Sequence, residues 1–579
     1  MYHPVVQESR KSPGIRGIES GYNNPNPTLT EVAVKDRHPD GAMAILWTGL
    51  LVLATSCAWA QEFDNPLRVG VPQDWTQHHV VFSHDALVQH PDLIYNEPRI
   101  VHQLLQRGQG ANSKVFRGAE TTPISSGITS QRDWNVALGS GRIAPEMFPA
   151  KYSFDPGAPP SCQNDYVVMG LNVAGASGRQ ANFVAFNNLY AGTGGLCGAA
   201  PTVMFAYDVS TVFGGRILTS PVPSLDGKKL AFVESRSGSS VFHVVTWATG
   251  PGNGTITAAA VPGVGNTASM TSLTFAAALD SRSSPWVDYN TDNAYVGADN
   301  GNVYKITGVF NGTPALAGAP WPVAVSPGYR PTAPVLDKNL GLVMVAGANG
   351  NLYSINATTG VVKRLAIGSS TNHGILAPPI VDVTNGTSFV VTANDGTSGV
   401  LVEVDSATMT PLAKARIGLA SHSGTAVNLY QPAFDNNYYN DPGTGVVRLC
   451  GTGAADITPW QYAFGFTGRV MNTTAVFSQQ LLNVTTARCT GWQEFYNPNV
   501  NGGTDFFFFG LTQNCTGTGT PGCVVARTSD TSLTKANVTG GPSGIVVDNY
   551  STAGQASSLY LSNQGTPNTA YKFTQNGLN

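Results

Sequence analysis

Charged residues are scarce in this sequence. Lys, Arg, Asp and Glu together make up 12% of its 579 residues, about half the share found in an average globular protein. Lysine and glutamate are especially few, which argues against a coiled coil, a mainly helical protein or a charged disordered chain. The net charge of −3 also argues against a basic surface for nucleic acid or an anionic membrane, so we expect no nucleic-acid partner.

Several sequence motifs that would indicate a metal, haem or catalytic site are also absent. The sequence has no C-x-x-C, which weakens any case for a cysteine metal site, and no C-x-x-C-H for covalent c-type haem. It has no G-x-S-x-G nucleophile motif. The absence of these motifs does not decide whether the chain is an enzyme, but it favours the interpretation that it is not.

One apolar stretch, Met43–Ala60, lies near the N-terminus, and it is too short for a comfortable membrane span. It ends in Ala-Trp-Ala, a small-x-small pattern typical of signal-peptidase sites, and therefore predicts export. Either Met43 is the true start, which we favour although it leaves no basic residue before the apolar core, or the first residues form a long n-region that carries Lys35 and Arg37. We expect no transmembrane span in the mature chain.

The same stretch also allows a lipid anchor. Residues 54–57, Ala-Thr-Ser-Cys, resemble a lipoprotein processing site in which Cys57 would be lipidated. Because Ala replaces the usual Leu at the first position, we rank this second. The predicted locations are periplasmic, extracellular or, with the anchor, at the cell surface.

The remaining cysteines are even in number, which in an exported chain predicts disulfides. Six cysteines allow 15 pairings, and spacing alone does not choose among them. We predict pairing between nearest neighbours, namely Cys162–Cys197, Cys450–Cys489 and Cys515–Cys523.

Glycine is abundant, at 65 residues, and a repeat accounts for part of it. The segments PWVDYNTDNAYVGADNGNVYKI and PVLDKNLGLVMVAGANGNLYSI match at Pro, Asp, Gly, Tyr and Ile. The matched pairs are Pro285 and Pro334, Asp288 and Asp337, Gly301 and Gly350, Tyr304 and Tyr353, and Ile306 and Ile355. A third copy starts at Pro379. Fainter copies start near Pro221, Pro432, Glu494 and Pro542, and one more follows Cys162, which makes eight units.

Each unit contains the signals of four antiparallel strands. Asp ends a short apolar strand and suits the turn that follows, and Asn-Gly is a strong hairpin signal. Four strands per repeat at this period predict an all-β fold, a single β-propeller with eight blades. A linear solenoid is the alternative, and seven blades would result if the region 432–530 contains one unit fewer. We expect the run Phe506–Phe509 to be a buried blade strand.

The pattern Pro-x-x-Asp, then Tyr-Val-Gly-Ala, then Asn-Gly-Asn-x-Tyr-x-Ile resembles the PQQ-type propeller repeat of the quinoprotein alcohol dehydrogenase-like superfamily. The resemblance is clear over residues 285–405, and the whole chain resembles exported bacterial propeller proteins that are uncharacterised. It implies the fold and says little about activity. The adjacent cysteines of the quinone enzymes are absent, so we expect no PQQ and predict no resident cofactor, with a divalent metal as the alternative.

The sequence before the repeats does not match them. We divide the chain into an N-terminal extension with signal peptide over 1–60, a histidine-containing segment over 61–144 that packs on the propeller, and the propeller over 145–579. Residues Ile100–Arg107 predict a helical stretch. We expect the closing outer strand of the last blade to come from Ala150–Phe154.

Four histidines, His78, His79, His84 and His90, lie close together among several aspartates. Imidazoles and carboxylates are ligands for zinc, copper or nickel, so these four are the candidate metal ligands. Adjacent His78 and His79 would point to opposite faces of a strand, and the spacing matches no known site. A histidine-rich segment that packs against the propeller is therefore the favoured interpretation.

These observations lead to three functional hypotheses. The first is an exported, non-catalytic binding or scaffold protein whose partner is a glycan, a peptide or a cell-surface molecule. The second is a redox or carbohydrate-active enzyme with its site in the central funnel, where loops of several blades converge. The third is a metal-binding exported protein. We favour the first, because no catalytic constellation is recognisable.

Overall fold

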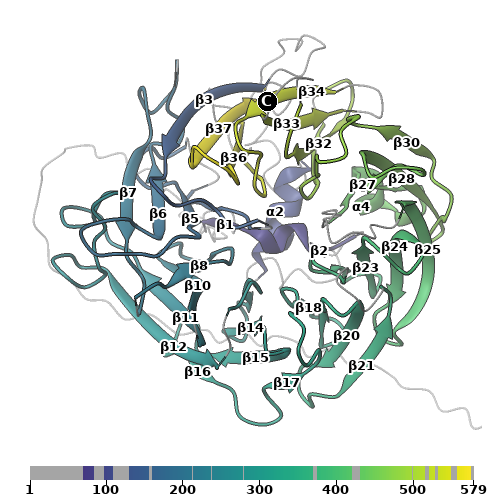
Figure 1. Cartoon of the computed structure of the whole chain (residues 1–579), viewed down its shortest axis with the longest axis horizontal. Coiled ribbons are helices and arrows are strands. Elements are labelled where there is room, and N and C mark those ends of the chain that lie inside the picture. Colours follow the sequence, from purple (N-terminus) through teal and green to yellow (C-terminus); the bar gives the residue numbers. More distant parts are fainter. Residues whose placement is uncertain are drawn as a thin grey trace, which may run out of the picture. The chain divides into compact units, whose positions relative to one another are not determined.

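The strands form eight sheets around a central axis (Figure 1). The computed structural model describes residues 70–83, 97–107, 130–145, 147–155, 160–192, 194–211, 213–236, 238–277, 280–368, 374–419, 431–498, 500–515, 521–528, 533–548 and 557–575. Each sheet corresponds to one of the eight repeat units. The prediction of an eight-bladed β-propeller is confirmed, and region 432–530 does hold two blades.

The first four blades follow one another along the chain. Blade 1 contains β1 (Val71–Gln73), β4 (Ala150–Ser153), β5 (Tyr166–Gly170), β6 (Phe183–Asn187) and β7 (Thr202–Tyr207). Blade 2 contains β8 (Arg216–Ile217), β9 (Val222–Pro223), β10 (Lys229–Arg236), β11 (Ser239–Thr246) and β12 (Ser269–Ala276). Blade 3 contains β13 (Trp286–Asp288), β14 (Asn293–Gly297), β15 (Asn302–Thr307), β16 (Ala315–Leu316) and β17 (Val323–Ala324). Blade 4 contains β18 (Val335–Asp337), β19 (Leu342–Ala346), β20 (Asn351–Asn356) and β21 (Val362–Ala366).

The other four blades complete the ring. Blade 5 contains β2 (Val80–Val81), β22 (Ile380–Asp382), β23 (Thr387–Thr392), β24 (Ser398–Asp405) and β25 (Thr410–Leu419). Blade 6 contains β26 (Ala433–Phe434), β27 (Val446–Thr452), β28 (Pro459–Thr467), β29 (Val470–Met471) and β30 (Phe477–Gln480). Blade 7 contains β31 (Gln493–Asn497), β32 (Thr504–Leu511), β33 (Gly522–Arg527) and β34 (Thr534–Val538). Blade 8 contains β35 (Val546–Asp548), β36 (Ser558–Ser562), β37 (Thr569–Gln575) and β3 (Ser130–Ala137).

The repeated Asn-Gly-x-x-Tyr residues act together at the β14–β15 hairpin and its equivalent in blade 4. Gly301 has φ +87, and a Cβ there would lie 2.2 Å from the carbonyl oxygen of Ser326, so only glycine fits this turn. The Asn300 side-chain amide donates to the Tyr304 hydroxyl over 2.9 Å. Asn349 donates to Tyr353 in the same way over 2.7 Å. The repeat thus couples a turn to a strand within each blade.

The core lies within and between the blades, where inner strands are buried on both faces. The Phe506–Phe509 run lies on β32, and all four of its side chains are buried. This confirms that the run is a blade strand. The three predicted disulfides are also confirmed, as Cys162–Cys197, Cys450–Cys489 and Cys515–Cys523.

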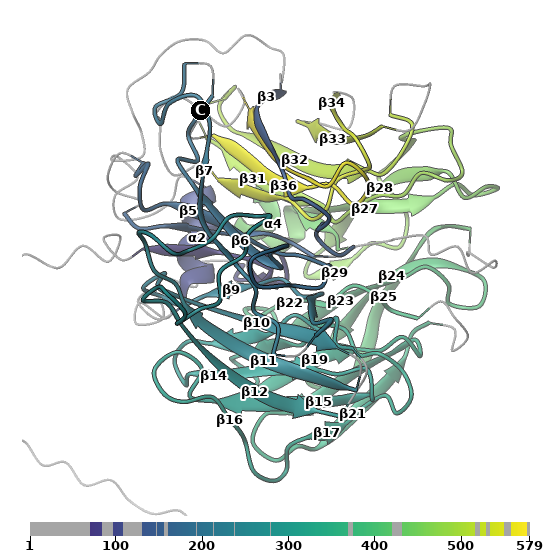
Figure 2. The same cartoon turned by 60° about the vertical axis from the view of Figure 1, so that its left-hand side comes forward.

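The closing strand of the ring is β3, which pairs antiparallel with β37 of the last blade. Both views show it, in dark blue, beside the yellow C-terminal strands (Figures 1 and 2). The prediction that Ala150–Phe154 closes the ring is wrong, because β4 lies between β1 and β5 in blade 1. All four residues of β4 are buried, as an inner strand requires, whereas the side chains of Arg132 and Asn135 on β3 are exposed.

The N-terminal segment crosses the central channel. Strand β1 pairs antiparallel with β4 of blade 1, and β2 pairs parallel with β22 of blade 5. Blades 1 and 5 are opposite each other in a ring of eight, so residues 70–83, here called the strut, span the ring. Between its strands lies the 3₁₀ helix η2 (Trp75–His78), which Asp74 and Gln77 cap reciprocally.

Within the part of the chain that the structure describes, the helices are few and short. Helix α2 (Pro98–Gln106) lies in the middle of the ring (Figure 1) and confirms the helical stretch predicted near Ile100–Arg107. In blade 6, α4 (Asn436–Asn440) and η4 (Pro442–Thr444) follow β26. No helix within the described ranges has the length and apolar character needed to cross a membrane.

Candidate functional site

The candidate site is a funnel at the end of the channel where the innermost strands begin. It has an empty volume of about 540 Å³, which includes space open to solvent. Residues just ahead of the innermost strand contribute from every blade, and the strut supplies the floor. The lining consists of Trp75, His79, Met147, Phe148, Ser220, Arg282, Ser284, Ala333, Leu376, Ala377, Pro378, Gln431, Thr490, Gly491, Gly544 and Gln564.

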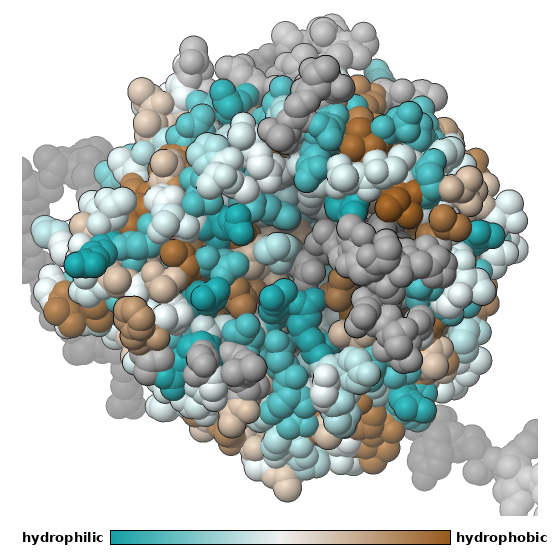
Figure 3. All heavy atoms as spheres, in the orientation of Figure 1, coloured by the Kyte–Doolittle hydropathy of each residue, from teal (hydrophilic) through white to brown (hydrophobic). Residues whose placement is uncertain are grey.

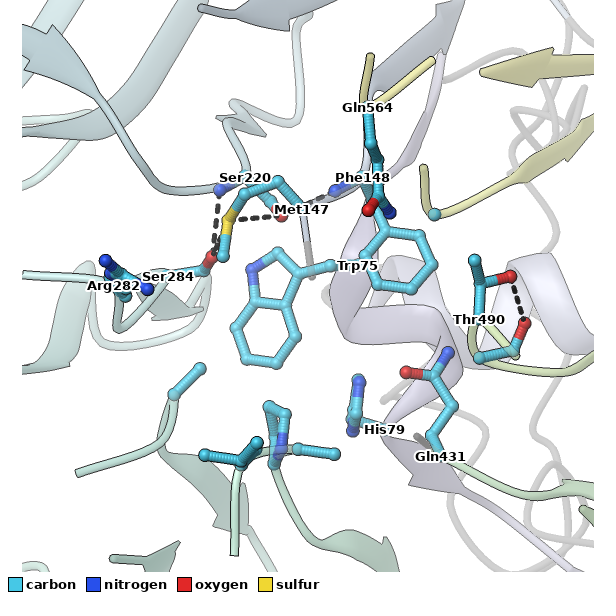
Figure 4. A pocket seen from close by; sticks show the side chains of 16 residues that line it. Trp75, His79, Met147, Phe148, Ser220, Arg282, Ser284, Gln431, Thr490 and Gln564 are labelled. Atoms are coloured by element: carbon cyan, nitrogen blue, oxygen red, sulfur yellow. Dashed lines mark hydrogen bonds between the residues drawn. The ribbon is translucent and has the colours of Figure 1, made fainter. Parts of the chain in front are cut away.

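Trp75 occupies the centre of the funnel floor (Figure 4). Its indole Nε1–H donates to the carbonyl oxygen of Pro285 over 3.2 Å, and its ring packs edge-on against Trp286 at 6.0 Å. Only 2% of Trp75 is exposed. The strut therefore fixes the floor to the start of blade 3.

His79 holds the other end of the floor. Its Nδ1 lies 3.3 Å from the carbonyl oxygen of Pro379, so this nitrogen carries the proton and donates. Burial lowers the pKa of His79 to about 4, against hydrogen bonds that raise it. The imidazole is thus neutral at physiological pH and is poorly matched to proton transfer there.

Gln431 brings a side-chain amide to the funnel wall, where it hydrogen-bonds with His79. The residue is 3% exposed. The side chain lies beside His79 and opposite Arg282 (Figure 4). Gly491 makes room for it, because a Cβ on that glycine would lie 2.7 Å from Cδ of Gln431.

The rest of the lining is apolar or already bonded. The Ser220 hydroxyl accepts from the Phe148 backbone N–H, and the Ser284 hydroxyl accepts from the Ser220 N–H. Gln564 donates to the carbonyl oxygen of Pro542. None of the described lining residues is a carboxylate, and Arg282 is exposed.

Beneath the floor, the channel is filled by a buried charge network centred on Arg99 of α2. Its Nη1 donates to Glu97 over 2.8 Å, its Nε to the Thr76 hydroxyl over 2.8 Å and its Nη2 to the carbonyl oxygen of Val287 over 2.9 Å. The guanidinium lies over the Trp286 ring at 3.8 Å. Arg99 therefore ties α2 to both the strut and blade 3.

Further ion pairs extend this network to other blades. Lys338 of blade 4 lies 2.5 Å from Glu97 and 3.0 Å from Asp288. On the other side, Arg107 pairs with Glu494 of blade 7 and lies over the ring of Tyr439. The channel interior is thus occupied by the chain itself.

The repeated aspartates act first as turn formers, as predicted. Asp337 accepts from the backbone N–H of Leu340 over 3.0 Å, and Asp382 accepts from the N–H of Asn385 over 3.0 Å. Burial raises the pKa of Asp337 to about 6. Asp382 also accepts from the hydroxyls of Ser83 and Tyr438, which links the end of the strut to blade 5.

The structure describes two of the four candidate metal ligands. His78 stacks on Phe148 with ring centroids 5.2 Å apart, whereas His79 bonds to Pro379. His84 and His90 lie outside the described residues. Among those that are described, no three His, Cys, Asp or Glu side chains are grouped to hold a metal ion. A metal site at these histidines stays a prediction.

Sequence reasoning missed the lining of the funnel, although a signal for it exists. In six blades, the residue directly before the proline that starts the innermost strand lines the funnel. These residues are Phe148, Ser220, Ser284, Ala333, Pro378 and Gln431. The repeat prolines therefore mark the rim of the site.

No model of a known protein family matches the sequence, and no curated protein matches it. Among solved structures, the chain is similar to BamB from Moraxella catarrhalis, with 13% identity and a TM-score of 0.43 over 77% of this chain and 100% of that one. It is also similar to Sqt1 from Saccharomyces cerevisiae (9% identity, TM-score 0.46, 77% and 99% covered) and to the Dos1 propeller (11%, 0.48, 77% and 95%). The fold assignment rests on the eight sheets of the chain itself.

Proposed function

We propose that this chain is an exported, non-catalytic binding or scaffold protein that holds its ligand in the funnel. The observation that carries the proposal is the convergence of all eight blades and the strut on one concave site. A preformed concavity with apolar walls and few polar groups is the usual form of a ligand site.

The chemistry of the lining supports binding rather than turnover. His79 and Arg282 are the charged or titratable side chains among the described lining residues. The pKa of His79, about 4, makes it a weak base at neutral pH. The likeness to PQQ-type repeats supports the fold of each blade, and we propose no quinone cofactor.

Export is supported by the three disulfides, which persist in oxidising compartments. We propose cleavage after Ala60. N-terminal sequencing of the secreted chain should then begin at Gln61, and replacement of Ala60 by Glu should leave the precursor uncleaved. A mature N-terminus at a lipidated Cys57 would instead establish the anchored form.

The binding role is tested with immobilised glycans and peptides. Ala377→Trp would fill the funnel, since Ala377 lines it, and Ala315→Trp on the exposed strand β16 is the matched control. We expect binding to at least one class by the wild type and the control, and none by Ala377→Trp. Turnover of redox or glycosidic substrates that Ala377→Trp abolishes would contradict the proposal.

A further inference from the structure

We propose that Lys151 and Asp548 react with each other to form an amide bond that closes the ring of blades covalently. Lys151 lies on β4 of blade 1, and Asp548 ends β35 of blade 8. The bond therefore joins the first blade to the last. It is a self-modification at the seam of the propeller and is independent of the funnel and its ligand.

The two reacting groups are in contact and shielded from water. Nζ of Lys151 lies 2.7 Å from Oδ2 of Asp548, and the two side chains are 0% and 2% exposed. A carboxyl C–O bond is about 1.2 Å long, so the carboxyl carbon is at most about 4 Å from the amine nitrogen. Both groups are held on paired strands, so they stay close to the geometry from which an amine attacks a carboxyl carbon.

Burial favours the uncharged forms that the reaction needs. A buried ion pair has lost the hydration of both charges, and transfer of one proton from the ammonium to the carboxylate gives a neutral amine beside a carboxylic acid. Burial raises the pKa of Asp548, against the attraction of Lys151, and the nearby carboxylate of Asp165 raises it further. Asp165 is itself fixed in place, because it accepts from the backbone N–H of Phe154 and the hydroxyl of Tyr190.

The reaction is a condensation whose atoms balance without a cofactor. The lone pair of the Lys151 nitrogen attacks the carboxyl carbon of Asp548 and forms a C–N bond. The nitrogen loses a proton, the C–O bond breaks, and the hydroxyl leaves with that proton as water. The product is a neutral amide, which carries no charge that burial would destabilise.

Two other lysine–carboxylate contacts among the described residues lack these conditions. At the seam between blades 3 and 4, Lys338 contacts both Glu97 and Asp288, so two carboxylates stabilise its positive charge. The side chain of Lys414, which contacts Asp395, is 51% exposed, so water keeps its ammonium group charged.

The pair Lys572–Asp133 in blade 8 is the best internal control. Its side chains are also buried, and Nζ lies 2.7 Å from Oδ2. This oxygen accepts from Lys572 and, over 2.6 Å, from the hydroxyl of Thr574. Two donors on one carboxylate oxygen are the pattern of a hydrogen-bonded ion pair, and we expect this pair to remain one.

The described part of the surface shows no patch of one kind that would mark a second site. Hydrophobic residues are scattered among hydrophilic ones on the face shown in Figure 3. The largest exposed apolar side chains, Phe213, Val264, Val361 and Val476, lie in different blades or loops. The buried seam, rather than the surface, therefore holds the groups that are placed to react.

The test is the mass of the mature wild-type chain, denatured and with its disulfides reduced. One amide should lower the mass by about 18 Da, the mass of one water. Trypsin should then fail to cut after Lys151 and should release peptide 143–179 joined to peptide 536–572. The joined peptides distinguish the amide from an aspartate that has lost water to a succinimide, which leaves the two peptides separate. A full mass, with cleavage after Lys151, would overturn the proposal.

Three variants locate the bond. Lys151→Arg keeps the positive charge but removes the reactive amine, and Asp548→Ala removes the carboxyl group, so both should show the full mass. Lys572→Arg alters the control pair and should still show the loss of about 18 Da. A loss that survives Lys151→Arg and disappears in Lys572→Arg would place the bond in the control pair and overturn the proposal. The wild-type measurement needs no variant, so a folding failure of any of them leaves the test intact.

Discussion

The buried Arg99 gives the sharpest test of how the strut and α2 hold the ring together. Its side chain is 0% exposed and ion-paired with Glu97 at 2.8 Å. Removing one partner of a buried ion pair costs about 3–5 kcal/mol, because the other charge stays buried. Arg99→Met keeps most of the apolar stem of the side chain, and we expect it to lower the free energy of unfolding by about 3 kcal/mol. This value is the lower limit of that range, because Lys338 still pairs with Glu97.

A double-mutant cycle isolates the ion pair from the packing. Glu97→Gln leaves Arg99 and Lys338 without their shared carboxylate, and the double variant Glu97→Gln/Arg99→Met removes both members of the pair. The double variant should therefore lose less stability than the sum of the single variants, by about 1–3 kcal/mol. Lys338 remains near Asp288 at 3.0 Å in either case.

The assay is equilibrium unfolding in urea followed by near-ultraviolet circular dichroism, which reports on the packing of aromatic side chains, including Trp286 beneath the guanidinium. Arg364→Met on the exposed strand β21 is the control and should stay within about 0.5 kcal/mol of the wild type. An Arg99→Met variant as stable as this control would refute the inference that the network anchors the strut and α2.

Three further perturbations test other parts of the structure. Burial lowers the pKa of His79 to about 4 and of His102 to about 3. Since an unfolded histidine titrates near 6.5, the unfolded chain binds more protons between these values, and stability should fall as the pH drops from about 6.5 to about 4. Urea titrations should show a smaller fall in the free energy of unfolding for His79→Gln than for the wild type. The pKa values of Glu403 and Asp337 are raised to about 7 and about 6, so these two groups stabilise the fold as the pH drops, equally in the wild type and the variant. The loop-entropy estimate predicts a larger loss of stability for the longer disulfide loop. Removal of the Cys450–Cys489 bridge, with a sequence separation of 39, should cost about 4 kcal/mol, and removal of Cys515–Cys523, with a separation of 8, should cost about 2.5 kcal/mol. Equal urea midpoints for the two Cys→Ser pairs would contradict this estimate. Trp134→Ala on the closing strand should cost about 3–5 kcal/mol, because this ring contacts Phe186 and Tyr560 and donates to the Leu189 carbonyl; calorimetry should show a much smaller loss for Trp134→Phe.

The blades could be predicted because their information is local. The Asn-Gly turn, the tyrosine hydroxyl that accepts from Asn300, and the aspartate that ends the first strand all lie within one repeat. Each blade therefore carries its own sequence signal, even where the copy is faint. The nearest-neighbour disulfides follow the same logic, since each bridge spans no more than 39 residues.

The closing strand and the strut could not be predicted, because their partners are distant in sequence and unlike the repeat. Strand β3 pairs with β37, more than 400 residues away, and strand β2 of the strut is only two residues long, Val80 and Val81. Short strands with partners at such distances leave no periodic pattern. The choice of Ala150–Phe154 as the closing strand failed because strand-like composition does not say which edge a strand joins.

The funnel is an intermediate case, and it shows what the N-terminal segment contributes. The repeat prolines locate its rim, but the floor of Trp75 and His79 comes from the strut. The side chain of Gln431 has room only because Gly491 in the next blade lacks a Cβ. The segment predicted over 61–144 thus supplies the closing strand of blade 8, the α2 charge network and the floor of the site. A propeller made of repeats alone would have an open channel on its axis. This chain fills that channel with its own residues. Its candidate site is therefore a shallow funnel at one end of the channel rather than a deep central cavity.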